Sequence, residues 1–124
     1  MNDFMDLQAT QVAMNLVEEI YRLYCKLPKE ETYGLISQLK RASTSIVANI
    51  AEGFGRYTYW DKAHHFTIAR GECTEVVAHL LIAVRVHLLT QKDIQSSLAL
   101  SDQTGKLLSG LIFSSRKRAA SPSS

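Results

Sequence analysis

The chain has few of the residues that interrupt helices. Pro28 and Pro122 are its only prolines, and it has six glycines among 124 residues. Because proline and glycine are the main punctuators of local structure, their scarcity excludes a fold made of many short strands and tight turns. Hydrophobic residues make up 46% of the chain, which is typical of a globular protein rather than a disordered one. We therefore expect a single domain built from a few long helices.

Cysteines and uninterrupted apolar segments are also scarce. Cys25 and Cys73 stand alone, without a CxxC motif or a metal-ligand spacing, so we expect reduced, packed thiols and a cytoplasmic location. The longest apolar run, residues 76–89, is interrupted by two histidines and an arginine, which argues against a membrane span. Two aspartates near the N-terminus stand where a secretory leader would need positive charge.

What the chain does contain is apolar residues at three- and four-residue spacings, as one face of a helix requires. Four such segments can be distinguished, at residues 7–27, 32–55, 59–89 and 90–116. Pro28 ends the first segment and Gly55 the second, while threonine–x–x–aspartate spacings at Thr58 and Thr90 are typical of helix N-caps. The predicted fold class is all-α, an antiparallel up-down-up-down four-helix bundle over residues 1–118. Residues 119–124 are expected to form a disordered tail.

The segment NIAEGFGR at residues 49–56 departs from an ordinary amphipathic pattern. Asn49 falls on the apolar stripe of the second helix, where a buried amide needs a hydrogen-bond partner and can fix helix register. Gly53 falls on the same stripe. Antiparallel pairing about residue 56 places Gly53 level with Tyr59 and Trp60, so we expect an aromatic ring to pack over the glycine.

Three strings in the sequence resemble a known family. LPKEETYGLISQLKRASTSI at residues 27–46, NIAEGFGR at 49–56 and IARGECTE at 68–75 are similar, in order and separation, to motifs of a family of four-helix-bundle proteins. These are encoded within intervening sequences of bacterial large-subunit ribosomal RNA genes. The resemblance covers about residues 4–112 and departs from the common pattern at Val47 and Glu72, where proline and serine are usual. Its structural signature here is Asn49, Glu52, Gly53 and Gly55.

That family also resembles the accessory variability determinant of diversity-generating retroelements. The determinant is a ring-shaped homopentamer that binds a reverse transcriptase and nucleic acid. The resemblance therefore implies a bacterial four-helix bundle that assembles as a homo-oligomer, expected to be a pentamer. It also implies RNA or DNA and a reverse transcriptase as partners.

The distribution of charge supplies candidate phosphate-binding residues. The net charge is only +2, but residues 1–31 carry six acids and residues 76–124 carry six bases. The candidates are Lys40, Arg41, Arg56, Lys62, Arg70, Arg116, Lys117 and Arg118. Arg41 and Arg70 are expected at one level, with either a phosphate or a nearby glutamate (Glu52, Glu72 or Glu75) between them. The cluster at residues 116–118 either complements the helix dipole or forms a mobile phosphate-binding arm.

Aromatic residues gather at the joint between the second and third segments. Tyr57, Tyr59 and Trp60 can stack on unpaired bases, pack at a subunit contact or cover the end of the bundle. We predict that they form an oligomer interface.

Catalytic patterns are not evident in the sequence. Asp61 with His64, and Glu75 with His79, have spacings suited to metal ligands, but a di-metal bundle needs a Glu-x-x-His on each of two helices. Both pairs lie on the third segment, and the sequence has no nucleophile elbow, phosphate loop or Cys–His arrangement. We therefore predict no metal, no cofactor and no enzymatic activity. The predicted function is a scaffold that binds nucleic acid, and the alternative is a protein–protein scaffold that does not.

Overall fold

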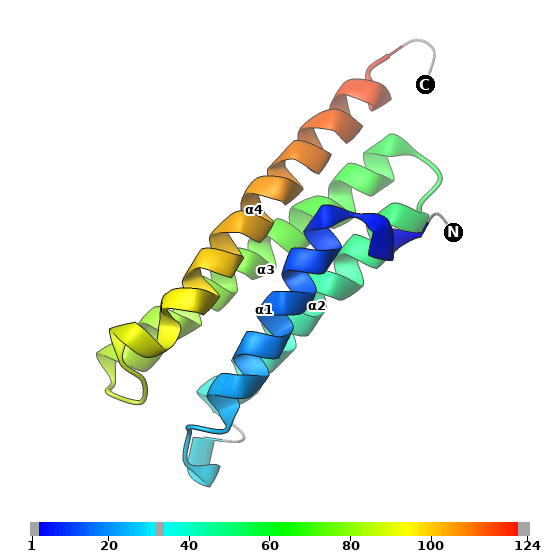
Figure 1. Ribbon diagram of the computed structural model, residues 1–124. Coiled ribbons are helices and arrows are strands. Elements are labelled where there is room, and N and C mark those ends of the chain that lie inside the picture. The colour runs from blue at the N-terminus through cyan, green and yellow to red at the C-terminus, as the bar shows by residue number, and fades with distance from the viewer. Residues whose placement is uncertain (1–2, 32–33, 122–124) are drawn as a thin grey trace.

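The computed structural model describes residues 3–31 and 34–121, and within them it contains four long helices and no strand. The helices are α1 (Gln8–Tyr24), α2 (Leu35–Gly55), α3 (Tyr59–Arg85) and α4 (Gln91–Ala119), with short 3-10 helices η1 (Phe4–Asp6) and η2 (Lys29–Glu31). Successive helices run antiparallel along a common axis (Figure 1). The predicted all-α four-helix bundle is confirmed. Of the predicted tail, residues 119–124, Ala119 belongs to α4, and the amides of Ala120 and Ser121 donate to the carbonyls of Arg116 and Arg118, so this part is ordered. Residues 122–124 lie outside the described residues.

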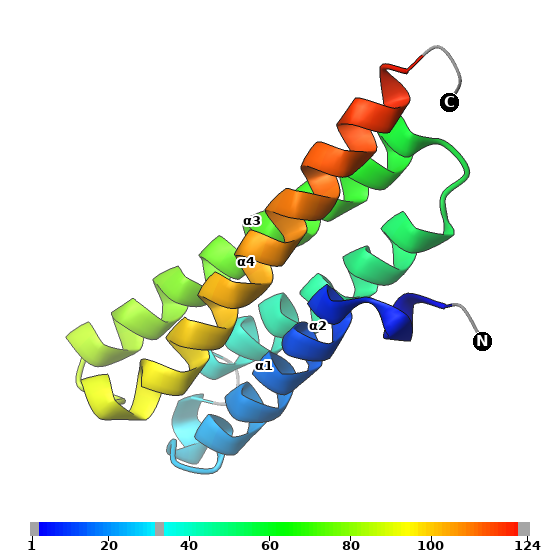
Figure 2. The same ribbon diagram turned by 45° about the horizontal axis from the view of Figure 1, so that its top comes forward.

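Each of the four helices packs on two others around one core, and Figure 2 shows the α1–α2 pair beside the α3–α4 pair. Among the described residues, α1 packs on α2 and α4, and α3 packs on the same two helices, whereas the diagonal pairs do not meet. Figure 1 shows the α2–α3 loop, the start of α1 and the last turns of α4 at one end of the bundle. We call this the α2–α3 end.

The helix starts follow from local hydrogen bonds that the sequence predicts. The Asp61 amide donates to Thr58 Oγ1 at 3.1 Å, which caps α3. At α4 the capping box is complete: the Asp93 amide donates to Thr90 Oγ1 at 3.1 Å, and the Thr90 amide donates to Asp93 Oδ2 at 2.9 Å. Both predicted caps are confirmed. However, α3 ends at Arg85, four residues before its predicted end, because His87 adopts a left-handed φ of 65° that no helix can continue through.

The buried surfaces of the helices differ in composition. The face of α2 buries Ile36, Leu39, Ile46 and Ile50, all fully enclosed. In contrast, α4 buries three large side chains and a row of hydroxyl residues. The row consists of Ser97, Ser101, Thr104 and Ser115. Thr104 Oγ1 donates to the Leu100 carbonyl, as a helix-interior threonine can, whereas the Ser97 and Ser101 hydroxyls have no partner in the described part of the chain.

An aromatic ring packs over Gly53, as predicted, but the prediction of which residue supplies the ring is wrong. A Cβ atom at Gly53 would lie 2.7 Å from Cε1 of Phe66, in the second turn of α3, rather than beside Tyr59 or Trp60. Helical side chains lean toward the N-terminus of their helix, so Phe66 covers a position about one turn before its own backbone. The simple pairing rule ignores this lean, and it also sets the level of α3 two or three residues too early, because the Lys62 carbonyl lies 3.2 Å from the same Cβ position.

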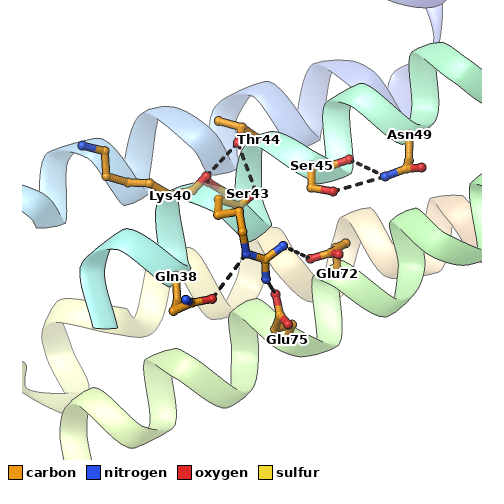
Figure 3. A network of polar contacts seen from close by, with 9 residues as sticks. Gln38, Lys40, Ser43, Thr44, Ser45, Asn49, Glu72 and Glu75 are labelled. Carbon is orange, nitrogen blue, oxygen red and sulfur yellow. Dashed lines mark hydrogen bonds and ion pairs between the residues drawn. The ribbon is translucent and has the colours of Figure 1, made fainter. Parts of the chain in front are cut away.

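Asn49 does not link two helices. Its Nδ2 donates to the Ser45 carbonyl at 3.0 Å and to Ser45 Oγ at 3.2 Å, both within α2 (Figure 3). The side chain is only half-buried. Its amide is thus satisfied by the preceding turn, and these bonds give it no role in helix register.

Candidate nucleic-acid interface

Arg41 is neutralised within the bundle. From the middle of α2 it reaches across to α3, where Nη2 contacts Glu75 Oε2 and Nη1 lies 3.6 Å from Glu72 Oε2 (Figure 3). Its Nε also donates to Gln38 Oε1 at 3.3 Å. Of the two anions considered for this position, the structure provides the glutamates. Arg41 is therefore a poor candidate for binding phosphate.

Two glutamates side by side on α3 would repel each other if both were charged. Burial raises the pKa of Glu72 above its ordinary value, and the hydrogen bond and negative charge of Glu75 raise it further. The Arg41 guanidinium opposes both effects. One turn along, both ring nitrogens of His79 are buried with no hydrogen-bond partner in the described residues.

Three further predicted bases are held by their own surroundings. The Lys40 ammonium lies 4.2 Å from the centre of the Tyr24 ring and 4.9 Å from that of Tyr21, on the α1 side of α2. Lys62 donates to the Phe54 carbonyl at 2.7 Å, so it satisfies the C-terminal end of α2. Arg56 pairs with Glu52 at 3.3 Å, as the spacing predicts. These contacts reduce the attraction of each of the three bases for an anionic ligand.

Arg70 lies on the opposite side of α3 from Arg41. Its Nη1 donates to Ser109 Oγ of α4 at 3.3 Å, and it makes no ion pair with an acid in the described chain. The expectation that Arg41 and Arg70 share one anion is therefore wrong, because a shared level along the axis does not fix the direction in which each side chain points. Arg70 instead lines a groove of about 390 Å³ between α3 and α4.

The α3–α4 groove combines positive charge with hydroxyl groups. Lys106 and Asp102 also line it and pair with each other at 3.1 Å, so their charges offset each other as those of Arg56 and Glu52 do. Thr74 and Ser109 contribute exposed hydroxyls, whereas the Ser101 hydroxyl at the groove floor is buried. Guanidinium, ammonium and hydroxyl groups are the side chains that commonly bind phosphate oxygens.

The predicted cluster at the end of α4 is helical and exposed. Arg116 and Lys117 have no ion pair or hydrogen bond from their side chains in the described residues, and Arg118 donates to Tyr59 Oη at 3.1 Å. These bases fall in the last turns of α4, where positive charge also complements the helix dipole. The mobile-arm interpretation does not fit residues 116–118, which belong to the helix.

The aromatic residues at the joint have different environments. Tyr59 is half-buried and lies under Arg118, so it covers the end of the bundle. Tyr57 is 100% exposed and Trp60 60% exposed. Phe113 of α4, which the sequence analysis did not single out, is 70% exposed. Its only signal in the sequence is an aromatic residue off the apolar stripe of α4.

The outer face of α3 carries a second group of apolar residues that the predicted apolar stripe does not include. Ile68, Leu81, Ile82 and Val86 are between 37% and 54% exposed, and small residues (Gly71, Thr74 and Ala78) separate them. A helix that is apolar on both sides is typical of one that is covered on both sides. We call this row of residues, from Ile68 to Val86, the outer α3 face.

The candidate metal pairs do not form a site in the described residues. No group of three or more histidine, cysteine, aspartate or glutamate side chains there could hold a metal ion. The His64 ring packs edge-on against His65, with centroids 5.3 Å apart, and Glu75 is engaged by Arg41.

The helix order, the NIAEGFGR joint and the absence of strands from the described residues define a protein of the four-helix-bundle class. Residues 5–110 match the model of the 23S rRNA-intervening sequence protein family, and the chain belongs to that family.

A solved structure supports this assignment. It is a protein with unknown function from the S23 ribosomal protein family of Bacteroides thetaiotaomicron VPI-5482. It has a TM-score of 0.78 and 26% sequence identity, over 85% of this chain and 95% of that one. No curated protein matches the chain. Among the described residues, no helix combines the length and apolarity that crossing a membrane requires.

Proposed function

We propose that the protein is a non-catalytic, homo-oligomeric scaffold that binds nucleic acid. The observation that carries the proposal is the contrast between its bases. Arg41 is neutralised by two glutamates, whereas Arg70, Arg116 and Lys117 face solvent or an open groove and make no ion pair with an acid in the described chain. Unpaired cations on a protein of small net charge favour a polyanionic partner.

The mechanism is electrostatic. Arg70, with the exposed hydroxyls of the α3–α4 groove, binds phosphates along one side of the bundle, and Arg116 and Lys117 bind them at the α2–α3 end. Each contact releases condensed counterions, so affinity depends on salt rather than on base sequence. The bases of one subunit make a weak site. Several copies in one assembly would present this site several times, which raises the overall affinity for a long strand.

Self-association through the outer α3 face supplies those copies. Burial of its exposed apolar residues is favourable, and Arg85, exposed in the last turn of α3 between Ile82 and Val86, is a charge that such an interface has to keep at its solvated rim. A pentamer is the assembly implied by the family resemblance, and light scattering on the purified protein measures it. The reverse transcriptase implied by the same resemblance is tested separately, by co-purification from a nuclease-treated lysate.

Salt titration tests the proposal. RNA and DNA affinities are measured over a series of salt concentrations for the wild-type protein, Arg70→Ala and Arg116→Ala. We expect each variant to weaken binding to all sequences about equally and to reduce the log–log salt slope by about 1. The control is Lys92→Ala, which removes an exposed charge from the other end of α4.

One result of the titration would contradict the proposal. If the wild-type protein binds neither RNA nor DNA at low salt, nucleic-acid binding is excluded and the protein–protein scaffold becomes the better interpretation. The outer α3 face is the observation that favours this alternative.

A further inference from the structure

The α2–α3 end carries exposed aromatic rings beside unpaired bases. Trp60 and Tyr57 lie at the start of α3 and in the loop before it, and Phe113 lies near the end of α4. An exposed aromatic ring costs free energy in water, and each of these three is more than half exposed. The core does not account for their positions.

Two contacts fix the register of α3 against α4 at this end. Arg70 meets Ser109, and Tyr59 meets Arg118. The turns of α4 that carry Phe113 and Arg116 therefore lie level with the first two turns of α3, where Trp60 stands. Figures 1 and 2 both show the last turns of α4 beside the first turns of α3. The rings and the unpaired bases thus share one end of the molecule.

The acids at this end do not cancel its charge. Glu52 is paired with Arg56, whereas Asp3 and Asp6 accept hydrogen bonds from the backbone of η1 and keep their negative charges. Asp61 is exposed on the first turn of α3 and makes no ion pair in the described chain. Against these three carboxylates stand four bases: Arg116, Lys117, Arg118 (held over the Tyr59 ring) and Lys62 (bonded to the Phe54 carbonyl).

Flat rings interspersed with cations are suited to unpaired bases. A base stacks on an aromatic ring only when it is not paired inside a duplex, and the phosphates between successive bases are bound by lysine and arginine. The bases of a regular duplex are already stacked on one another, so a duplex could use the cations but not the rings.

We infer that the α2–α3 end binds single-stranded nucleic acid, with bases stacked on Trp60, Tyr57 and Phe113 and phosphates bound by Arg116 and Lys117. This inference rests on the proposed nucleic-acid binding and adds the form of the ligand. RNA and DNA strands share the chemistry that it requires, and both are included in the test.

Trp60 provides a direct readout, because it is the only tryptophan in the chain. The probes are oligo-uridine and oligo-deoxythymidine of about 12 nucleotides, a length within the usual range for such sites, and a mixed-sequence duplex of equal length. We expect both single strands to quench the fluorescence of Trp60 on binding and the duplex to leave it nearly unchanged.

Substitutions separate stacking from charge. Trp60→Ala should weaken binding of the single strands about 10-fold, without changing the salt slope, because no phosphate contact is lost. Trp60→Phe should retain most of the affinity, because it keeps a ring. Tyr21→Ala is the control, since it removes a ring that is 45% exposed and lies under Lys40 at the other end of the bundle. Circular dichroism and light scattering verify the fold and assembly of each variant.

Failure of this inference can be distinguished from failure of the proposed function. Stacking is excluded if the wild-type protein binds single strands and duplex with equal affinity, the strands do not quench Trp60 fluorescence, and Trp60→Ala does not weaken binding. Electrostatic binding is retained in that case. If Trp60→Ala instead dissociates the oligomer, the ring belongs to a subunit contact and the inference is overturned. If no nucleic acid binds at all, both fail.

Discussion

Gly53 of α2 and Phe66 of α3 fit together across the bundle so closely that a Cβ on the glycine would lie 2.7 Å and 2.9 Å from two atoms of the ring. Phe66 is 4% exposed and has little room to move aside. The Lys62 carbonyl, 3.2 Å from the same point, limits the space further. Glycine is thus required here by the packing of two helices and not by an unusual backbone angle.

We predict that Gly53→Ala destabilises the fold. Overpacking a buried contact costs about 1–3 kcal/mol, and alanine recovers about 1 kcal/mol through its better helix propensity, so a net loss of about 1 kcal/mol is expected. Gly110→Ala is the matched control, because no atom lies within 4 Å of the position of its Cβ. It should be neutral or stabilising. Urea unfolding measures both, and a stabilised Gly53→Ala protein would contradict the packing argument.

A double substitution tests the same contact. In a Phe66→Leu background the ring is gone, so Gly53→Ala should cost less than it does in the wild-type protein. The difference between the two costs is the coupling energy of the pair. Equal costs in both backgrounds would exclude Phe66 as the reason for the glycine.

Asp93 makes stability depend on pH. The hydrogen bond from the Thr90 amide lowers the pKa of Asp93 below its ordinary value of 3.8, and the contacts with Lys26 and the Thr90 hydroxyl act in the same direction. A lowered pKa stabilises the folded state above the ordinary value, and this contribution disappears as the pH falls through the folded value. Asp93→Asn should therefore be less stable than the wild-type protein above pH 3.8, with the difference narrowing below it.

Unfolding curves of both proteins at several pH values above and below 3.8 provide the measurement. Asp102→Asn removes the same charge from an exposed position of α4 and controls for net charge. A stability difference for Asp93→Asn that does not change with pH would show that the capping box does not depend on the ionised carboxylate.

The two cysteines should react at very different rates. Cys73 is packed as predicted, with 4% of its surface exposed, and burial raises its pKa to about 12, but the same prediction is wrong for Cys25, which is exposed. Because the thiolate is the reactive form, a maleimide reagent should label only Cys25 in the folded protein and both residues after unfolding. Mass spectrometry counts the labels. Rapid labelling of a folded Cys25→Ser variant would show that the core around Cys73 opens easily.

The outer α3 face gives the clearest test of self-association. Ile82→Asp places a charge where a second copy is proposed to pack, and burying an unpaired charge costs several kcal/mol or more. We expect this variant to be a folded monomer by light scattering. Ala99→Asp, at an exposed position of α4, should leave the assembly intact. An intact Ile82→Asp oligomer would place the interface elsewhere, including at the predicted Tyr57 and Trp60.

The sequence was sufficient for the elements of the fold but not for all of their ends. Apolar spacing identified four helices, and the threonine caps at residues 58 and 90 marked two of their starts within one residue. The early end of α3 could not be predicted, because a histidine with positive φ has no distinctive local signal. The spacing of apolar residues also gave little indication of the outer α3 face, because α3 itself carries apolar residues on more than one side.

The candidate site was less predictable, for a geometric reason. Periodicity gives the face of each helix but not the rotation of one helix against the next. A common level along the bundle axis therefore predicts that Arg41 and Arg70 lie close together. In the structure, Arg41 contacts Glu75 of α3, whereas Arg70 contacts Ser109 of α4. Distinguishing an internal glutamate from an external phosphate requires that rotation. Phe113 was missed because a single exposed aromatic residue breaks no pattern.

The hydroxyl row on α4 bears on the order in which the molecule opens. Ser97, Ser101, Thr104 and Ser115 are buried but contribute little apolar surface, whereas α2 buries isoleucine and leucine side chains. Local opening requires least free energy where the fewest apolar contacts are lost. Amide hydrogen exchange should accordingly release α4 before α2. The helix that carries the terminal bases would then be the one able to shift while the other three keep their shape.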